Sequence, residues 1–404
     1  MFNRLLKSLT SLRLTVVLLT AGLVLVLVGT LAQVHEGLYQ AQARYFKSWL
    51  VWRPMIGDSA WPVLLPGGYL IGSLLLLNLV SAHAARFKFT KKKIGILMIH
   101  AGIVLLLVGQ MLTDLLARES YMQLSTEGPA KYYSESSMHN ELAVIDATDP
   151  ASDEVIAIPE SRLREKREIH DSKLPFTIRV REYLPNSLPQ LLAPMAGRTR
   201  NDHQGIGRFI AFAGQPLTAK MDSRNIPAAT IEILGGKEPL GLWDVSNWLS
   251  ERSLVKEIQQ ESGGALKGLL GAPQKFNFGG HTYQLALRPV RAYQPFRVQL
   301  LQFTHAVYRG TDIPKDFTSR IRLCNPQTGE DREVKIYMNN PLRYAGTTFY
   351  QGSYDPKDPR VSILQVVKNP GWLTPYLSCA LVALGLIVQF LTHLLGFAAK
   401  WRIA

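Results

Sequence analysis

An imidazole lies inside one of the most apolar stretches of this chain. His100 stands seven residues after the lysine triplet Lys91–Lys93, within the run Ile94–Thr113, which has no charged side chain. A run of about 20 apolar residues is long enough to cross a bilayer. Placing an ionisable side chain at membrane depth is costly, so His100 is a candidate functional residue. It could ligate a metal, or it could simply hydrogen bond to a neighbouring helix.

A second histidine occupies a comparable place in the last apolar run. His393 precedes Lys400 by seven residues, and its run, Trp372–Ala399, is expected to cross in the opposite direction to Ile94–Thr113. With a rise of about 1.5 Å per residue, both imidazoles are expected roughly 10 Å inside the same boundary. Two facing imidazoles can hold a haem iron axially. A haem between His100 and His393 is therefore one hypothesis, and simple solvation of His393 near the helix end is the other.

The remaining residue types offer little chemistry. The two cysteines, Cys324 and Cys379, lack the spacing of a metal or redox motif, and one lies in an apolar run while the other does not. No disulfide between them is expected, and buried free thiols are the plain interpretation of both. The chain has no GxSxG, P-loop or HExxH motif. No catalytic constellation is predicted.

Long apolar runs predict four transmembrane helices. Three lie before residue 118 and one after residue 371: Leu14–Ala32, Trp61–Ala82, Ile94–Thr113 and Trp372–Ala399. The first run is longer than the apolar part of a signal peptide, so we expect it to be retained as a helix. Pro62, Pro66 and the glycines that follow predict a kink or a late start in the second helix.

The net charge of +14 is concentrated beside these runs. Residues 1–14, 83–93 and 398–404 contain ten Lys and Arg and no Asp or Glu. By the positive-inside rule, both termini and the connection between the second and third helices are predicted to be cytoplasmic. The rest of the chain carries 35 basic and 31 acidic residues. Membrane topology thus accounts for most of the charge, and no nucleic-acid binding is predicted.

Residues 118–371 have the pattern of an extracytoplasmic, antiparallel β-rich domain. Short alternating runs predict strands, at Pro175–Tyr183, Arg208–Ala213, Ala229–Leu234, Tyr283–Leu287, Arg297–Phe303 and Glu333–Met338. Gly279–Gly280 predicts a hairpin turn. An amphipathic helix is predicted at Pro239–Ile258, and an interfacial helix within residues 29–55. The fold class is therefore an integral membrane α+β protein, divided into residues 1–117, 118–371 and 372–404.

Four segments of the chain, in this order, resemble the ResB family, the smaller membrane subunit of system II cytochrome c maturation. They are Ser11–Gln33 (SLRLTVVLL…GTLAQ), Ile99–Gly109 (IHAGIVLLLVG), Arg291–Leu323 (RAYQPFRVQLLQFTHAVYRGTDIPKDFTSRIRL) and Asn339–Asp355 (NNPLRYAGTTFYQGSYD). The arrangement of three helices, a large outer domain and one further helix also resembles this family. The resemblance covers nearly the whole chain.

This resemblance implies a subunit of a holocytochrome c synthase complex in the bacterial inner (cytoplasmic) membrane. Its partner would be a ResC/CcsA-type membrane subunit, and together they would move haem across the bilayer and present it, reduced, to apocytochrome c. His100 matches the third-helix histidine that is one axial haem ligand in fused relatives, where the partner half supplies the other. The tryptophan-rich haem-handling motif belongs to the partner, so this chain is expected not to catalyse thioether formation alone.

The family also implies contact between a cysteine and apocytochrome thiols, for which Cys379 and Cys324 are the candidates. Two alternatives remain open. One is a membrane cytochrome b-type electron carrier with haem on His100 and His393. The other is a non-haem membrane anchor whose β-rich domain binds a periplasmic partner. Absorbance spectra with and without the ResC-type subunit would separate the three.

Overall fold

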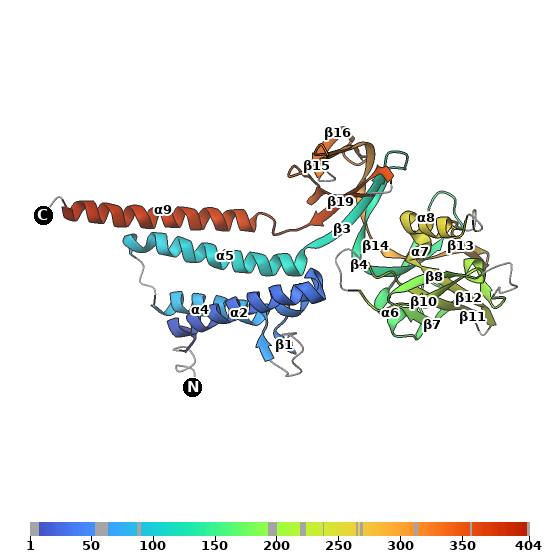
Figure 1. Ribbon diagram of the computed structural model, residues 1–404, viewed down its shortest axis with the longest axis horizontal. Helices are drawn as coiled ribbons and strands as arrows, with labels where there is room; N and C mark the ends of the chain where they lie inside the picture. Colours follow the sequence, from blue (N-terminus) through green and yellow to red (C-terminus); the bar gives the residue numbers. More distant parts are fainter. Residues whose placement is uncertain are drawn as a thin grey trace.

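The computed structural model describes residues 8–52, 64–86, 90–192, 200–218, 224–236, 238–263, 266, 270–310, 314–355 and 358–401. Its long helices lie side by side, with a β-rich domain at one end of them (Figure 1). Among these described residues, four helices are long and apolar enough to cross a membrane: α2 (Leu12–Glu36), α4 (Gly68–Arg86), α5 (Ile94–Leu116) and α9 (Thr374–Trp401). The predicted set of four apolar helices is confirmed.

The second helix starts later than its apolar run. Strand β2 (Leu64–Pro66) pairs with β1 (Leu50–Trp52), and α4 begins only at Gly68. Extension of this helix to Trp61 was therefore wrong, although Trp61 itself lies outside the described residues. The proline–glycine prediction of a late start is confirmed, because Pro66 ends a strand and cannot donate a backbone hydrogen bond.

The interfacial helix predicted within residues 29–55 is replaced by shorter pieces. Helix α2 runs on to Glu36, and Gly37, with φ of 78°, turns the chain. Two short helical segments follow, α3 (Leu38–Ala41) and the π-helical η1 (Gln42–Phe46), before strand β1. Residues 53–55 lie outside the described part of the chain. The apolar pattern alone predicted a single interfacial helix here, but Gly37 adopts a positive φ, which ends α2 and turns the chain.

Helices α5 and α9 pack closely through glycines spaced seven residues apart. Gly95, Gly102 and Gly109 are buried on one face of α5. A Cβ atom on Gly95 would lie 2.7 Å from the Gly385 carbonyl oxygen, and one on Gly102 would lie 3.0 Å from the Ser378 carbonyl oxygen. Small residues at this spacing let two membrane helices approach backbone to backbone. This contact fixes the register of α9 against α5.

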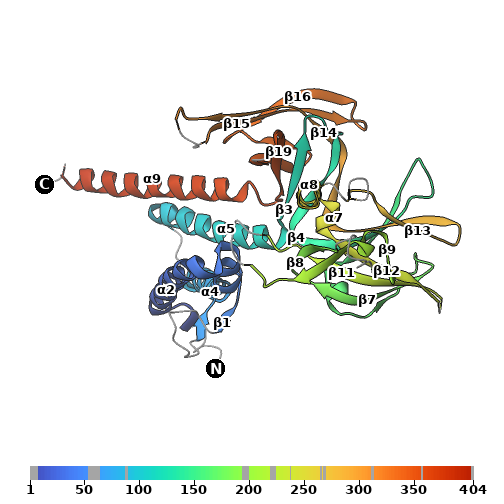
Figure 2. The ribbon, with the colours of Figure 1, turned by 45° about the vertical axis from the view of Figure 1, so that its right-hand side comes forward.

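The β-rich domain has two lobes, which strands β4 and β14 connect (Figure 2). The lobe next to the helices, here the proximal lobe, is formed by a highly curved sheet in the order β16-β15-β14-β4-β3-β19-β18-β17. Its buried core includes Met122, Phe296, Phe349 and Leu364. The strands are β3 (Arg118–Ser125), β4 (Lys131–Asp146), β14 (His281–Val307), β15 (Pro314–Asn325), β16 (Glu330–Tyr337), β17 (Leu342–Tyr344), β18 (Thr347–Asp355) and β19 (Asp358–Lys368).

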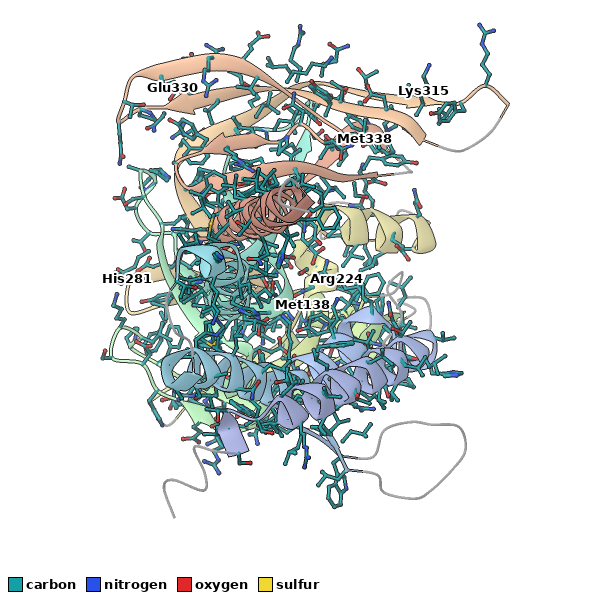
Figure 3. All side chains as sticks on the ribbon, turned by 90° about the vertical axis from the view of Figure 1, so that its left-hand side faces the viewer. Met138, Arg224, His281, Lys315, Glu330 and Met338 are labelled. Carbon is teal, nitrogen blue, oxygen red and sulfur yellow. The ribbon has the colours of Figure 1, made fainter. Side chains whose placement is uncertain are left out.

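The proximal lobe stands across the direction of the helices. Viewed roughly along α5 and α9, β15 and β16 form its outer layer, with Lys315 and Glu330 at opposite ends (Figure 3). Cation–π contact between Arg343 and Trp372, 4.2 Å from guanidinium carbon to ring centroid, joins this lobe to the segment that leads into α9. The lobe is thus anchored at the helix ends on this side of the molecule.

The distal lobe is a second layer of strands packed on β4, β5, β13 and the first half of β14. Its sheet has the order β6-β7-β11-β12-β9, and inward side chains such as Ile231, Ile233 and Trp243 fill the core. A ribbon of β8 and β10 packs nearby with helices α7 (Asn247–Ser250) and α8 (Arg252–Glu261). The remaining elements are β5 (Glu154–Pro159), α6 (Glu160–Arg164), β6 (Glu168–Ile169), β7 (Thr177–Leu184), β8 (Ser187–Leu191), β9 (His203–Gln204), η4 (Gly205–Arg208), β10 (Ile210–Gly214), β11 (Ala228–Gly235), β12 (Glu238–Ser246) and β13 (Gln274–Phe278).

Most predicted strands of this domain are confirmed. Tyr283–Leu287 and Arg297–Phe303 turn out to be parts of one long strand, β14, and Gly279–Gly280 forms the β13–β14 turn with φ of 61° and 81°. The helix predicted at Pro239–Ile258 was wrong in its first half. Glu238–Ser246 is strand β12, and helix begins only at Asn247, after the capping side chain of Ser246.

Candidate functional site

The structure pairs His100 with another histidine. His83 lies near the end of α4, and its Nε2 is 3.0 Å from Nδ1 of His100 on α5. The rings meet edge to face, with centroids 4.6 Å apart. Both side chains are half-buried between the two helices. The site is therefore a histidine pair rather than a single imidazole.

Hydrogen-bond direction fixes which nitrogens carry protons. Nδ1 of His83 lies 3.1 Å from the Leu79 carbonyl oxygen, which can only accept, so this nitrogen carries the proton. In neutral His83 the Nε2 atom then has a lone pair and accepts from Nδ1–H of His100. Neutral His100, protonated on Nδ1, keeps an unprotonated Nε2. This is the nitrogen and the tautomer that metal-binding histidines use, with the other ring N–H held by a hydrogen-bond acceptor.

Two sets of polar contacts hold the pair in place, one at the other ends of α4 and α5 and one within α4. Asp114, at the end of α5, forms an ion pair of 2.5 Å with Lys47 and accepts a hydrogen bond from Tyr69 at the start of α4. Asn78 of α4 is buried, accepts from Thr15 of α2 at 2.6 Å and donates to the Leu9 carbonyl oxygen. Helix α4 thus has polar contacts with α5 on one side and with α2 on the other. These contacts fix the rotation of α4 that turns His83 toward α5.

His393 does not meet His100. The contacts of Gly102 put Val382 of α9 beside α5 at the level next to His100, and those of Gly95 put Gln389 beside its first turn. His393 lies one turn beyond Gln389, is exposed, and its Nε2 is 2.7 Å from the amide nitrogen of Gln389. His100 lies seven residues from Lys93, and His393 lies seven residues from Lys400, so the sequence placed both imidazoles at the same depth. They are not opposite each other because α5 and α9 pack with an offset along their axes.

The cysteines lie on different elements of the fold. Cys324 is a half-buried residue of β15 in the proximal lobe, and Cys379 is exposed on α9 within its apolar stretch. Both are free thiols. Neither lies in the histidine pair, and their suggested contact with a client thiol stays a prediction.

His83 is the residue that sequence reasoning missed. It lies between small residues (SAHAAR) close to the basic connection, where a solvated histidine is the ordinary interpretation. Its significance depends on which face of α4 meets α5, and an apolar run does not encode that face. Across the described ranges, no group of three or more His, Cys, Asp and Glu side chains could hold a metal ion. A metal at His100 would therefore need a further ligand from elsewhere.

Four helices of membrane length and apolarity, with a β-rich domain at one end and a histidine pair between two of them, are the features expected of a multi-pass membrane protein with a large attached domain. Residues 272–363 match the family model described as ResB-like family. A stretch of 119 residues, 30% of this chain, is 36% identical to Protein NrfI of Wolinella succinogenes. Both matches support the resemblance to the ResB-like family that the sequence motifs predicted.

The extent of these matches is limited. The aligned stretch spans only 13% of the length of NrfI. The segment 272–363 covers β13 to most of β19, so it lies mainly in the proximal lobe and along β14. His83 and His100 lie outside that segment, and their role rests on their own geometry.

Proposed function

We propose that this chain is the ResB-type membrane subunit of a cytochrome c biogenesis complex, in which His100 offers one axial nitrogen to haem during its passage through the membrane. The observation that carries the proposal is the hydrogen-bonded pair His83–His100, which leaves the Nε2 lone pair of His100 unused. Haem iron supplies two axial positions that imidazole nitrogens commonly fill. The donor set of this chain fits one of them.

The same geometry supports a shared site. Both ring nitrogens of His83 are engaged, Nδ1 with the Leu79 carbonyl oxygen and Nε2 with His100, so His83 orients its neighbour instead of acting as the second ligand. His393 lies well along α9 from the pair. The second axial ligand is therefore assigned to a ResC/CcsA-type partner subunit, in agreement with the resemblance of the sequence to the ResB family.

The positions of the basic helix ends indicate from which side of the membrane haem would reach His100. The start of α2, the start of α5 and the end of α9 lie on the side of the helices away from the β-rich domain (Figure 1). The described basic residues Arg13, Lys92 and Lys93 lie at these helix ends, which favours a cytoplasmic location. Haem would then reach His100 from the cytoplasmic half of the inner membrane, and the β-rich domain would face apocytochrome c on the outer side.

The test is the absorbance spectrum of the purified full chain, alone and with its ResC/CcsA-type partner. We expect a reducible haem band in the complex, its loss in His100→Ala and its retention in His393→Ala. Exposed His35 of α2 provides a matched control, because His35→Ala removes an imidazole outside the pair.

Two other outcomes identify the alternative functions. Loss of haem in both His100→Ala and His393→Ala, without any need for the partner, favours the cytochrome b-type carrier. Absence of haem from every preparation, with the partner present, rules out both haem functions and favours a membrane anchor for a periplasmic protein.

A further inference from the structure

A hollow of about 500 Å³ lies on the outer face of the distal-lobe sheet, in the lobe farther from the four long apolar helices (Figure 1). The inward residues of β11 and β12 fill the core, so alternate residues of these strands face outward and line the hollow: Thr230, Glu232 and Leu242. A smaller hollow of about 180 Å³ shares Arg200, Glu182 and Thr230 with it and adds the apolar side chains of Leu184 and Phe212. The larger hollow is thus lined mainly by charged side chains, and the smaller one combines charged side chains with an apolar wall.

Arg200 lines both hollows, and two side chains contact its guanidinium group. Its Nη1 donates to Asp244 at 3.1 Å and its Nη2 lies 2.5 Å from Nε2 of His203. A guanidinium can only donate, so Nε2 of neutral His203 is the acceptor and Nδ1, 2.7 Å from the Asp244 carboxylate, carries the proton. The side chains of Asp244 and His203 are each only 3% exposed, whereas Arg200 is 35% exposed. A buried acid–imidazole pair therefore orients a cation that reaches solvent.

The second cation of the larger hollow is Lys166, whose backbone adopts a conformation that is unfavourable for residues other than glycine. Lys166 lines the larger hollow and has φ of 51°, in the left-handed region, where it follows the end of α6. Glycine is the usual residue at such a helix end because it has no Cβ atom to clash. Lys166 adopts this conformation while it contributes an ammonium group to the lining of the hollow. Residues held in unfavourable backbone conformations cluster at ligand-binding sites.

We infer that these hollows form a binding site for a carboxylate attached to an apolar body. Arg200 and Lys166 would receive the carboxylate, and the wall with Leu184 and Phe212 would receive the apolar group. Arginine presents a planar fork of donors that matches a carboxylate. Glu182 and Glu232 line the same hollow, and their charge disfavours a doubly charged phosphate more than a singly charged carboxylate. Arg181 is less available, since it is paired with Glu232 at 2.6 Å.

Calorimetric titration of the purified full chain in detergent tests the assignment. The probes are N-acetylphenylalanine, its carboxamide and hydrocinnamate, which separate the carboxylate from the ring and a polypeptide end from a non-peptide acid. We expect both carboxylates to bind, and the carboxamide to bind at least about ten-fold more weakly. Tighter binding of N-acetylphenylalanine identifies a polypeptide carboxy terminus as the ligand, and tighter binding of hydrocinnamate identifies a non-peptide acid. Equal binding of the carboxamide would overturn the proposal.

The variant Lys166→Gly separates binding from folding. It removes the cation and relieves the backbone strain, so affinity for the carboxylates should fall about ten-fold while the thermal midpoint stays the same or rises. Arg200→Gln should weaken binding similarly, and Lys173→Gln, an exposed lysine outside the hollows, should not. Unchanged affinity in Lys166→Gly would contradict the inference even if Arg200→Gln failed to fold.

Discussion

At the residue scale, His83 should act through His100 and not as a ligand. Removing it in His83→Ala leaves Nδ1–H of His100 without its acceptor, and loss of such an outer partner commonly lowers metal affinity about 10- to 100-fold. His83→Gln keeps an amide oxygen that can accept the same hydrogen bond, so it should restore much of the affinity. Haem titration of the partner complex measures both variants.

A readout without haem checks the same point. Nitrogen-15 chemical shifts of the histidine rings report which nitrogen is protonated. In the native chain His100 should be protonated on Nδ1, whereas His83→Ala should mix the two tautomers and His83→Gln should not. If His83→Ala leaves both the shifts and the affinity unchanged, His83 has no positioning role, whatever His100 does.

A carboxylate in the distal lobe gives a pH prediction. Burial raises the pKa of Glu160, but hydrogen bonds from Tyr183 (2.5 Å), Asn140 (2.9 Å) and Arg164 (2.6 Å) outweigh it and hold the pKa below its ordinary value of 4.5. A lowered folded-state pKa stabilises the fold above the ordinary value, and this stability is lost as pH falls through the folded-state pKa. Glu160→Gln should therefore lower the free energy of unfolding by about 1.5 kcal/mol near neutral pH.

The difference between Glu160→Gln and the native chain should shrink toward zero in acid, because the native carboxyl is then protonated too. Denaturant unfolding followed through the buried tryptophans Trp243 and Trp248 measures it at both pH values. Glu165→Gln, at an exposed position at the end of the same short helix, is the control. If the difference in free energy of unfolding were the same at both pH values, Glu160 would stabilise the fold by its packing and not by its charge.

At the scale of elements, the sequence predicted helices and strands far better than their faces. Apolar runs located α2, α5 and α9 because membrane length and apolarity are local properties. The contact between His83 and His100 depends on the rotation of α4, which Asn78 and Asp114 set through partners distant in sequence. Strand β12 is a similar case, because Trp243 and Val245 point into the core with the period of two that is typical of a strand. The sequence around them also fits a helix, and only the pairing of β12 with β11 distinguishes the two.

The glycines of α5 provide an element-scale prediction. Gly95→Ala places a methyl group 2.7 Å from backbone atoms of α9, which cannot move aside cheaply, so the fold should lose about 1–3 kcal/mol. Gly72→Ala in α4 meets nothing within 4 Å and should be neutral or stabilising by up to about 1 kcal/mol, because alanine favours helix. Thermal unfolding in detergent compares the two. Equal midpoints would mean that α9 is not held against α5 in the register described.

At the scale of the whole molecule, continuous strands join regions that the chain order separates. Strand β14 takes part in both lobes, and Lys256 of α8 in the distal lobe lies 3.1 Å from Asp358 of β19 in the proximal lobe. Strand β19 leads to α9, and β3 continues directly from α5. Helix α5, which carries His100, therefore leads into the β-rich domain, and α9, which packs on α5, follows it, so a change in the proximal lobe can reach the α5–α9 contact.

The orientation of the whole molecule is the last prediction. Because the basic helix ends lie together, away from the β-rich domain, this domain should face outward and residue 90 should face the cytoplasm (Figure 1). In a background with Cys324→Ser and Cys379→Ser, a membrane-impermeant maleimide should label Asp153→Cys in spheroplasts. Thr90→Cys should be labelled only after lysis. Both positions are exposed in the fold, so a difference in labelling reports the side of the membrane. Labelling of Thr90→Cys in sealed spheroplasts would reverse the orientation and put His100 in the outer half of the bilayer.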